Sequence, residues 1–385
     1  MKLWSSASSN PKLRSKMVLP NTMIAAVLMG HGGLEKLVVC DDIPVPEPKT
    51  NEVLIKVGAC GMNNTDINTR IGWYSKSVSN GTTSTGGSDG LDRLSEEDAT
   101  WGGGAVVFPR IQGADVVGRI AAVGATISSE RIGERVLVDP WVRDRSDPKN
   151  RNLAGYVGSE RDGGFAQYTT VPAENAFLIN SELSDAELAT FPCSYSTAEH
   201  MLHRVRLREG EKIVIPGASG GVGSALIQLA KRRGAWVLAI TGKAKMDAIQ
   251  ELGADAVLDR NQKDLEHQIC EILPGGEVDV VADVVGGSRF SMCLNLLCRG
   301  GRYVTSGAIA GPIVELDLRT LYLKDLEMHG ATVMPVGIFE NLVGYIEKGE
   351  IRPLLAGEFS INDIRKAQEA FLAKKHVGNL VVLPG

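Results

Sequence analysis

The 385-residue chain lacks the cysteine patterns of disulfide-rich and zinc-knuckle proteins. Its six cysteines include no Cys-x-x-Cys pair, so the sequence indicates neither a disulfide framework nor a structural zinc site. Free thiols in a reducing compartment, the cytoplasm, are the simpler interpretation. Acidic residues outnumber basic ones by 46 to 41, giving a formal charge of −5. This balance argues against nucleic acid as a partner, because a phosphate backbone requires a basic surface.

Long apolar runs are also missing. No stretch approaches the roughly 20 apolar residues that cross a bilayer, so we expect no membrane partner. Residues 1–22 have scattered charges and no apolar core. This pattern argues against a secretory signal and favours a flexible leader. We therefore expect a soluble, cytoplasmic protein, long enough for two ordinary domains.

The pattern of the remaining chain changes near residue 180. Before it, short apolar runs broken by glycine and proline predict β-strands. They are interrupted at 75–104 by a Gly-, Ser- and Thr-rich stretch without periodicity, which we expect to be either a lid or a surface insertion. After Ser184, a predicted helix N-cap with Glu187 three residues on, strand and helix patterns alternate. This alternation predicts a parallel sheet covered by helices on both faces.

The clearest chemical signal lies between a predicted strand and a predicted helix at residues 213–234. The sequence there reads IVIPGASGGVGSALIQLAKRRG. Its glycines would let a pyrophosphate approach the backbone, and the start of the helix offers free N–H groups. A tight packing turn is the alternative, but the flanking strand and helix favour dinucleotide binding. The predicted contacts are Gly217, Ser219, Gly220, Gly221, Val222 and Gly223.

The end of the next strand predicts which dinucleotide binds. An NAD site has an Asp or Glu there for the ribose 2′-hydroxyl. This chain instead has Thr241 and Gly242, followed by Lys243 and Lys245. The two ammonium groups suit the 2′-phosphate of NADP(H), unless they are only solvated at the start of a helix. The absent acid favours NADP(H).

Several motifs resemble those of the medium-chain dehydrogenase/reductase superfamily, from about Met23 to the C-terminus. They are ACGMNNTDINTRIG, IQGADVVGRIAAVG, the glycine turn, LGADAVLD and HVGNLVVL. The resemblance implies an α/β protein with a GroES-like, β-rich catalytic domain at 23–189 and 336–385. A Rossmann domain with a doubly wound parallel sheet would occupy 190–335, and the active site would lie between the two domains. In relatives a stretch like 316–334 joins two subunits edge to edge, so we expect a homodimer.

Two branches of this superfamily differ in their use of zinc, and the sequence favours the zinc-free one. Asn63 stands where the resemblance implies the first cysteine ligand, and Asp115 stands beside the position of the histidine ligand, in a Gly-Ala-Asp triplet. Cys193 occupies the third ligand position, whereas the expected four-cysteine loop at 139–165 contains no cysteine. One thiolate does not supply the tetrahedral set that zinc requires. An irregular site of Cys193, Cys60 and Asp115 is the alternative.

The motifs therefore resemble the quinone oxidoreductase branch. The resemblance implies an NADPH-dependent oxidoreductase that transfers hydride to a small molecule without a metal. A quinone, an enone or another activated alkene or carbonyl is the expected acceptor, because it delocalises the charge that a metal would otherwise stabilise. A zinc alcohol dehydrogenase with displaced ligands and a dinucleotide-binding scaffold without turnover stay as alternatives.

The resemblance also implies which side chains line the cleft. Asn63 is expected to hold the nicotinamide or the substrate oxygen, unless it only closes an Asx-turn. Tyr74 is expected to polarise a carbonyl or donate a proton, unless it only covers the domain core. Asp66 is expected mainly to fix a loop. The other expected neighbours of the cofactor are Thr197, Val285, Ser306 and Gly307.

Overall fold

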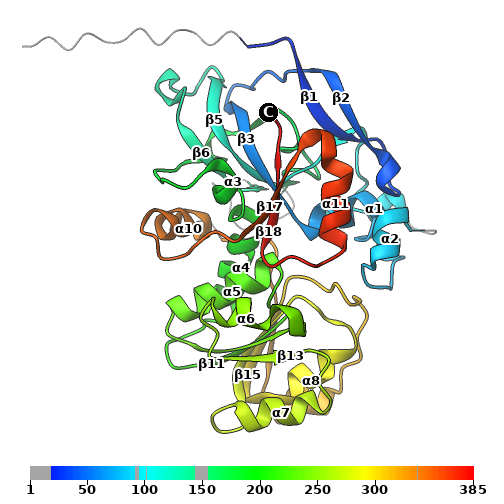
Figure 1. Cartoon of the computed structure of the whole chain (residues 1–385), viewed down its shortest axis with the longest axis vertical. Coiled ribbons are helices and arrows are strands. Elements are labelled where there is room, and N and C mark those ends of the chain that lie inside the picture. The colour runs from blue at the N-terminus through cyan, green and yellow to red at the C-terminus, as the bar shows by residue number, and fades with distance from the viewer. Residues whose placement is uncertain (1–18, 92–94, 101, 144–154, 336) are drawn as a thin grey trace, which may run out of the picture.

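The computed structural model describes residues 19–91, 95–100, 102–143, 155–335 and 337–385. They form two lobes, each built on a large β-sheet of its own (Figure 1). In this view the upper lobe contains the early strands together with the C-terminus, and the lower lobe contains the middle of the chain. The chain therefore passes from the upper lobe to the lower one and back.

The lower lobe is built on six strands that all run parallel, in the order β13-β12-β11-β14-β15-β16. The order reverses between β11 and β14, and ligands of such sheets bind beyond the strand ends at this point. The strands are β11 (Lys212–Pro216), β12 (Trp236–Thr241), β13 (Ala256–Asp259), β14 (Val278–Asp283), β15 (Leu297–Thr305) and β16 (Glu327–Gly330). The predicted doubly wound parallel sheet is confirmed.

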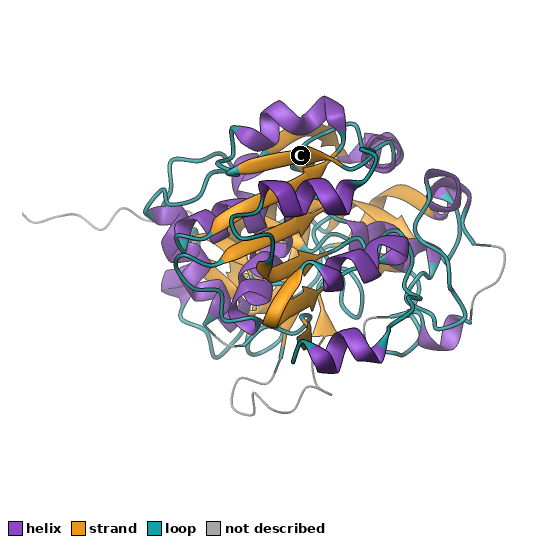
Figure 2. Ribbon diagram, turned by 90° about the horizontal axis from the view of Figure 1, so that it is seen from below, coloured by secondary structure: helices purple, strands orange, loops and turns teal. Residues whose placement is uncertain are grey.

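Helices cover both faces of this sheet (Figure 2). Ile213 and Ile215 of β11 belong to one apolar cluster and Val214 to another, so both faces of the strand are buried. The helices of this part of the chain are α4 (Pro192–Arg204), α5 (Gly221–Arg232), α6 (Met246–Gln250), α7 (Leu265–Ile272), α8 (Phe290–Asn295) and α9 (Leu318–Leu323). Across the described residues, no helix combines the length and the apolar character needed to cross a membrane.

A seven-stranded mixed sheet forms the upper lobe, in the order β10-β6-β5-β3-β18-β17 with β9 also paired to β3. Its strands are β3 (Glu52–Met62), β5 (Asp115–Val123), β6 (Arg135–Val138), β9 (Tyr168–Pro172), β10 (Ala176–Leu178), β17 (Leu355–Ser360) and β18 (Asn379–Leu383). Leu380 of β18 pairs antiparallel with Met62 of β3, so the C-terminal segment completes a sheet begun by the N-terminal part. The boundaries at 189/190 and 335/336 stay predictions.

Smaller elements surround this sheet. Two small sheets contain β1 (Thr22–Leu28), β2 (Leu37–Pro44) and β4 (Arg110–Ile111), and β7 (Trp141–Val142) with β8 (Gly155–Tyr156). The helices of the upper lobe are α1 (Asn64–Ile71), α2 (Ser84–Asp89), α3 (Asp185–Leu188), α10 (Ile338–Glu347) and α11 (Ile364–Leu372).

The helix predicted after Ser184 is present, but it is divided into α3 and α4. Glu187 N–H donates to Ser184 Oγ at 3.2 Å, and Ser184 N–H donates to the Glu187 carboxylate at 2.8 Å, which confirms the predicted cap. The new helix begins at Pro192, because proline has no N–H to donate within a helix but is accommodated in its first turn. The apolar side chains of α4 join those of both large sheets in one core, so α4 fixes the junction of the lobes.

The 75–104 stretch contains the short helix α2, where the sequence predicted no regular structure. The fully buried Arg70 of α1 anchors it. The guanidinium donates to the carbonyl oxygen of Gly87 in α2, to that of Gly32 at 2.7 Å and to Gln368 Oε1 of α11 at 2.8 Å. Burial lowers the pKa of Arg70 to about 10. This part of the insertion is therefore packed into the upper lobe.

Candidate active site

The glycine turn follows β11, at the carboxyl ends of the parallel strands. Gly217 has a φ of +69°, which favours glycine, and a Cβ there would lie 2.8 Å from a methyl group of Val285. Gly223 packs so closely against the turn that a Cβ would lie 2.4 Å from Gly217 O. Gly220, by contrast, is exposed, and α5 begins directly after it at Gly221. The first N–H groups of α5 therefore form a cradle that fits a pyrophosphate.

Lys245 is the predicted lysine that reaches this turn. Its Nζ lies 3.4 Å from Ser219 Oγ, whereas Lys243 is exposed. Thr241 is buried at the end of β12, and its hydroxyl has no hydrogen-bond partner within the described ranges. The acid paired with it in register, Asp259 of β13, accepts an N–H of its own loop. The end of β12 itself carries no carboxylate.

The loops after β14 and β15 bring Val285, Ser306 and Gly307 to the same edge of the sheet. Asp283 shapes the first loop by accepting the N–H of Val285 at 2.7 Å, and Tyr303 OH donates to Asp283 at 2.8 Å. Burial raises the pKa of Asp283. The remaining predicted contacts are partly buried near this edge: Val222 in the first turn of α5 and Gly242 after β12. Together these residues fit a dinucleotide.

The start of α1 carries the predicted catalytic residues Asn63 and Asp66. Asn63 N–H donates to one Asp66 oxygen at 2.7 Å, and Gly113 N–H donates to the other at 3.2 Å. Asn63 Nδ2 donates to Asp115 at 2.9 Å, and the second Asp115 oxygen accepts the N–H of Cys193 at 2.7 Å. Asp66 therefore joins two loops, and Asp115 links α1 to α4.

Both carboxylates of this turn are buried. Asp115 is 0% exposed and Asp66 is 2% exposed. Burial raises the pKa of Asp115 to about 8 and that of Asp66 to about 7, although hydrogen bonds from Asn63 to both groups lower these values in part. Near neutral pH the turn therefore retains protons that exposed carboxyl groups would have released.

Two tyrosines lie near Cys193. Tyr156 OH donates to Cys193 Sγ at 3.1 Å. Tyr74 forms hydrogen bonds with two side chains of α1 and is electrostatically coupled to Cys193. Thr197, one turn along α4, forms a hydrogen bond with the same thiol. Burial raises the pKa of both phenols and of the thiol, so all three are neutral at pH 7.

The insertion also reaches the lower lobe. Thr82 N–H donates to Ile309 O in the loop after β15 at 3.0 Å, and Thr82 Oγ1 donates to Asn68 Oδ1 at 3.0 Å. Gly81 approaches so closely that a Cβ would lie 2.5 Å from Ile309 O. We refer to Gly81 and Thr82 as the strap. The strap therefore contacts both lobes, and whether the 75–104 stretch acts as a lid stays a prediction.

Asn63, Asp115 and Cys193, which lie at or beside the expected zinc-ligand positions, are hydrogen-bonded to one another. Both Asp115 oxygens accept N–H groups, one of them from Asn63, and Cys193 Sγ accepts the hydroxyl of Tyr156. Cys60 is fully buried. In the described part of the chain, no three His, Cys, Asp or Glu side chains are grouped to hold a metal ion. This donor set does not fit a tetrahedral zinc site.

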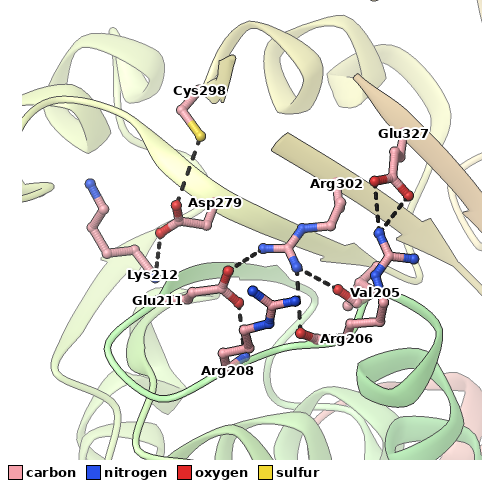
Figure 3. A network of polar contacts seen from close by, with 9 residues as sticks. All are labelled: Val205, Arg206, Arg208, Glu211, Lys212, Asp279, Cys298, Arg302 and Glu327. Carbon is pink, nitrogen blue, oxygen red and sulfur yellow. Dashed lines mark hydrogen bonds and ion pairs between the residues drawn. The ribbon is translucent and has the colours of Figure 1, made fainter. Parts of the chain in front are cut away.

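A polar network on the side of the lower sheet away from the glycine turn fixes the carboxyl end of α4 (Figure 3). Arg302 of β15 donates to Val205 O and to the Glu211 carboxylate, both at 2.6 Å. Arg206 pairs with Glu327 of β16 at 2.7 Å. These side chains line a hollow of about 250 Å³. The same helix carries Cys193 and Thr197, so the network helps to hold these two residues in place.

Two residues that contact this region were not predicted from the sequence: Tyr156, which donates to Cys193, and Lys374. Tyr156 falls within 139–165, a stretch in which the only expected motif was a set of four cysteines. Lys374 Nζ donates to Asn64 Oδ1 at 2.9 Å, beside the predicted catalytic residues. The lysine-rich segment before the closing strand was the only signal in the sequence, and it is weak.

Two family models match the chain. The model described as alcohol dehydrogenase GroES-like domain matches residues 49–181, and the model described as zinc-binding dehydrogenase matches residues 221–348. Together they cover more than half of the chain.

Individual proteins match over almost the whole length. A solved protein of Sinorhizobium meliloti 1021, provisionally assigned as an alcohol dehydrogenase, is 48% identical, with a TM-score of 0.85 over 95% of this chain and 98% of its own. The NAD-dependent alcohol dehydrogenase of Sulfurisphaera tokodaii is 26% identical over 354 residues, which are 89% of this chain and 96% of that protein. The quinone oxidoreductase of Mus musculus is 26% identical over 372 residues, which are 94% of this chain and 98% of that protein.

Proposed function

Because the chain belongs to the medium-chain dehydrogenase/reductase superfamily, and resembles both its quinone oxidoreductases and its zinc-type alcohol dehydrogenases, we propose that it reduces an activated acceptor with NADPH and without a metal. The acceptor is a quinone, an enone or another activated alkene or carbonyl. The observation that carries the proposal is the hydrogen bond between Asn63, at a position where the resemblance implies a zinc ligand, and Asp115, beside another such position. Without a Lewis acid, the acceptor must spread the negative charge over its own atoms.

NADP(H) is the proposed cofactor. The end of β12 carries no carboxylate to bind a ribose 2′-hydroxyl, and Lys245 lies beside Ser219 in the glycine turn. An ammonium group there favours a 2′-phosphate. We expect NADPH to bind at least about tenfold more tightly than NADH, a difference of about 1.4 kcal/mol. The NAD-dependent relative makes a side-by-side titration of the two cofactors the direct test.

The side chains of the cleft supply orientation and a hydrogen-bond donor. NADPH would supply the hydride when bound. Tyr74 keeps its hydroxyl proton at neutral pH, because burial raises the pKa of the phenol, and it can therefore donate to the acceptor oxygen as negative charge develops there. Asn63, held by Asp66 and Asp115, can orient the nicotinamide or the acceptor. The position of Asn63 beside α4, where its Oδ1 accepts the hydroxyl of Ser194 at 3.4 Å, supports this role.

An acceptor panel tests the proposal. NADPH oxidation should accelerate with a quinone such as 1,4-benzoquinone or with an enal, and a chelator should leave the rate unchanged. Stoichiometric zinc, together with alcohol oxidation that a chelator abolishes, would instead support the zinc-dependent alternative. Tight NADPH binding without acceptor-dependent oxidation would support the scaffold alternative.

The proposal includes a homodimer in the cytoplasm. Strand β16 pairs only with β15 within the described residues, which leaves its other edge available to a second copy. Exposed apolar side chains lie on β16 and in the segment that leads to it: Ile313, Leu318, Tyr322, Leu323 and Met328. All six cysteines are free, which supports a reducing compartment.

A further inference from the structure

Asn68 joins Tyr74 to the strap. The Asn68 side chain lies on α1 and is buried. Its Oδ1 accepts the hydroxyl of Thr82 at 3.0 Å, and its amide forms a hydrogen bond with the phenol of Tyr74, as does the hydroxyl of Thr65. Thr65 and Asn68 are three residues apart on one helix, so α1 presents both groups to the phenol. The phenol is therefore connected to the strap through a single amide.

The two ends of this amide differ in hydrogen-bonding character, since the oxygen only accepts and the NH2 group only donates. Because Oδ1 of Asn68 accepts from Thr82, the NH2 group is the end that remains for the phenol oxygen of Tyr74. The pKa of the phenol agrees with this direction. Burial raises that pKa, and the hydrogen bonds from Thr65 and Asn68 lower it in part, as donors to a phenolate oxygen do.

The strap is held from the lower lobe by the loop after β15. Thr82 N–H donates to Ile309 O at 3.0 Å, and the next residue of that loop, Ala310, donates its N–H to Val285 O at 2.8 Å. Val285 is one of the expected neighbours of the cofactor. Backbone hydrogen bonds therefore connect the loop after β14 with the hydroxyl that fixes the amide facing Tyr74.

We propose that Thr82 and Asn68 are positioning residues for Tyr74. The hydroxyl of Thr82 holds the Asn68 amide with its NH2 group toward the phenol oxygen, so the phenol keeps its own proton for a hydrogen bond to the acceptor oxygen. With the amide turned the other way, its oxygen would accept that proton and withdraw it from the reaction. The strap thus sets the direction of the hydrogen-bond donor in the cleft. The inference rests on the proposed function for the role of Tyr74.

A cycle of single and double substitutions tests the positioning role. Thr82→Val keeps the shape of the side chain and removes the hydroxyl. It should lower kcat for quinone or enone reduction about tenfold, the effect of one hydrogen bond, and leave NADPH affinity unchanged. Thr82→Ser retains the hydroxyl and should retain most of kcat. In the Tyr74→Phe variant no phenol proton is left to direct, so adding Thr82→Val should lower kcat no further.

An equal loss of kcat from Thr82→Val with and without Tyr74 would overturn the inference, because Thr82 would then act on the cleft as a whole. Thr126→Val is the matched control. The hydroxyl of Thr126 donates to Thr50 O at 2.7 Å at an exposed position, so the same substitution removes a similar hydrogen bond away from Tyr74. Its kinetics should equal those of the unchanged protein.

Asn68→Asp reverses the amide end that faces the phenol. The substitution replaces the NH2 group by a second oxygen, to which the phenol must donate its proton. It should therefore lower kcat about 100-fold, as much as Tyr74→Phe does. A kcat in Asn68→Asp equal to that of the unchanged protein would overturn the inference.

NMR of protein labelled at the Cζ atoms of tyrosine reports the hydrogen bonds of the phenol without turnover. The resonance of Tyr74 is identified by its loss in Tyr74→Phe. It should shift in Thr82→Val and in Asn68→Asp and stay in place in Thr126→Val, and an unshifted resonance in both would overturn the inference. If the resonance shifts as expected but no acceptor accelerates NADPH oxidation, the proposed function is wrong and the positioning of the phenol by the strap is retained.

Discussion

Asp115 accepts hydrogen bonds from Asn63 and Cys193 while it is fully buried, and burial raises its pKa from 3.8 to about 8 in the folded protein. Folding therefore takes up a proton between these two values. The stability contributed by that proton is present at low pH and is lost as the pH rises through 8. We predict that Asp115 lowers the free energy of unfolding by roughly 2 kcal/mol between about pH 6 and about pH 9.

Asp115→Asn tests this prediction because it keeps the shape of the side chain and one acceptor oxygen but does not titrate. Urea unfolding at both pH values should show a smaller loss of stability in the variant than in the unchanged protein. Asp41→Asn, at an exposed position, serves as the control. The same pH dependence with and without Asp115 would show that another group is responsible.

Tyr74 and Tyr156 differ in the use of their hydroxyl groups. Tyr156 OH donates to Cys193 Sγ, whereas Tyr74 is hydrogen-bonded to two side chains of α1 and lies directly before the insertion that carries the strap. We predict that Tyr74→Phe lowers kcat for quinone or enone reduction about 100-fold and leaves NADPH affinity unchanged, because only a hydrogen bond to the developing charge is lost. Tyr156→Phe should lower kcat less. Steady-state kinetics of both variants measure the two values of kcat. An equal loss of kcat in the two variants would contradict a special role for Tyr74.

At the scale of helices and strands, sequence patterns predicted the elements whose chemistry is local. The cap formed by Ser184 and Glu187 spans four residues, and the strand, glycines and helix of 213–234 are consecutive in the chain. The division at Pro192 was missed because apolar residues continue at helical spacing across it. Local patterns therefore predicted the fold but not every boundary.

Contacts between distant residues explain what the sequence did not predict in the site. Tyr156 reaches Cys193 only after β8 and α4 are packed together, and Lys374 meets Lys245 only after the C-terminal segment returns to the upper sheet. Neither pair has a sequence spacing that marks it. The family resemblance supplied Asn63, Tyr74 and most of the cofactor residues, and their roles stay predictions.

The strap allows a test of the insertion as an element. Gly81→Ala would place a methyl group 2.5 Å from Ile309 O, so the strap must move away from the loop after β15. Since closure of a cleft excludes water and positions the substrate, we predict that this variant lowers kcat/KM for the acceptor about tenfold. The melting temperature should change little, because Arg70 still anchors α2.

Gly104→Ala is the matched control for the strap. It lies in the same insertion, and the nearest atom to an added Cβ would be 3.9 Å away. Its kinetics should equal those of the unchanged protein. If Gly81→Ala and Gly104→Ala gave the same kcat/KM, the insertion would be a surface feature without a role in the reaction.

At the scale of the whole molecule, three segments join the lobes: α4, the strap and the loop 373–378 between α11 and β18. The first is a rigid connection, since its apolar side chains belong to a core shared by both sheets. The other two connect the lobes through a few polar contacts, such as Thr82 to Ile309 and Gly378 to Ser219. The site therefore lies between one fixed wall and two contacts that a ligand can strengthen, which favours tighter association of the lobes on cofactor binding.

The free edge of the lower sheet determines the expected assembly. Leu318 is 64% exposed and Leu323 is 57% exposed on α9, the helix that precedes β16 in the chain. Because exposed apolar side chains next to an open strand edge favour association, we predict a dimer at micromolar concentration in analytical ultracentrifugation. Leu318→Asp combined with Leu323→Asp should give a monomer, since a charge in the interface must be desolvated without a partner. Ile272→Asp on α7, at another exposed apolar position, should leave the dimer intact. A monomeric unchanged protein would contradict the predicted dimer. A dimer that survives the double substitution but not Ile272→Asp would place the contact surface elsewhere.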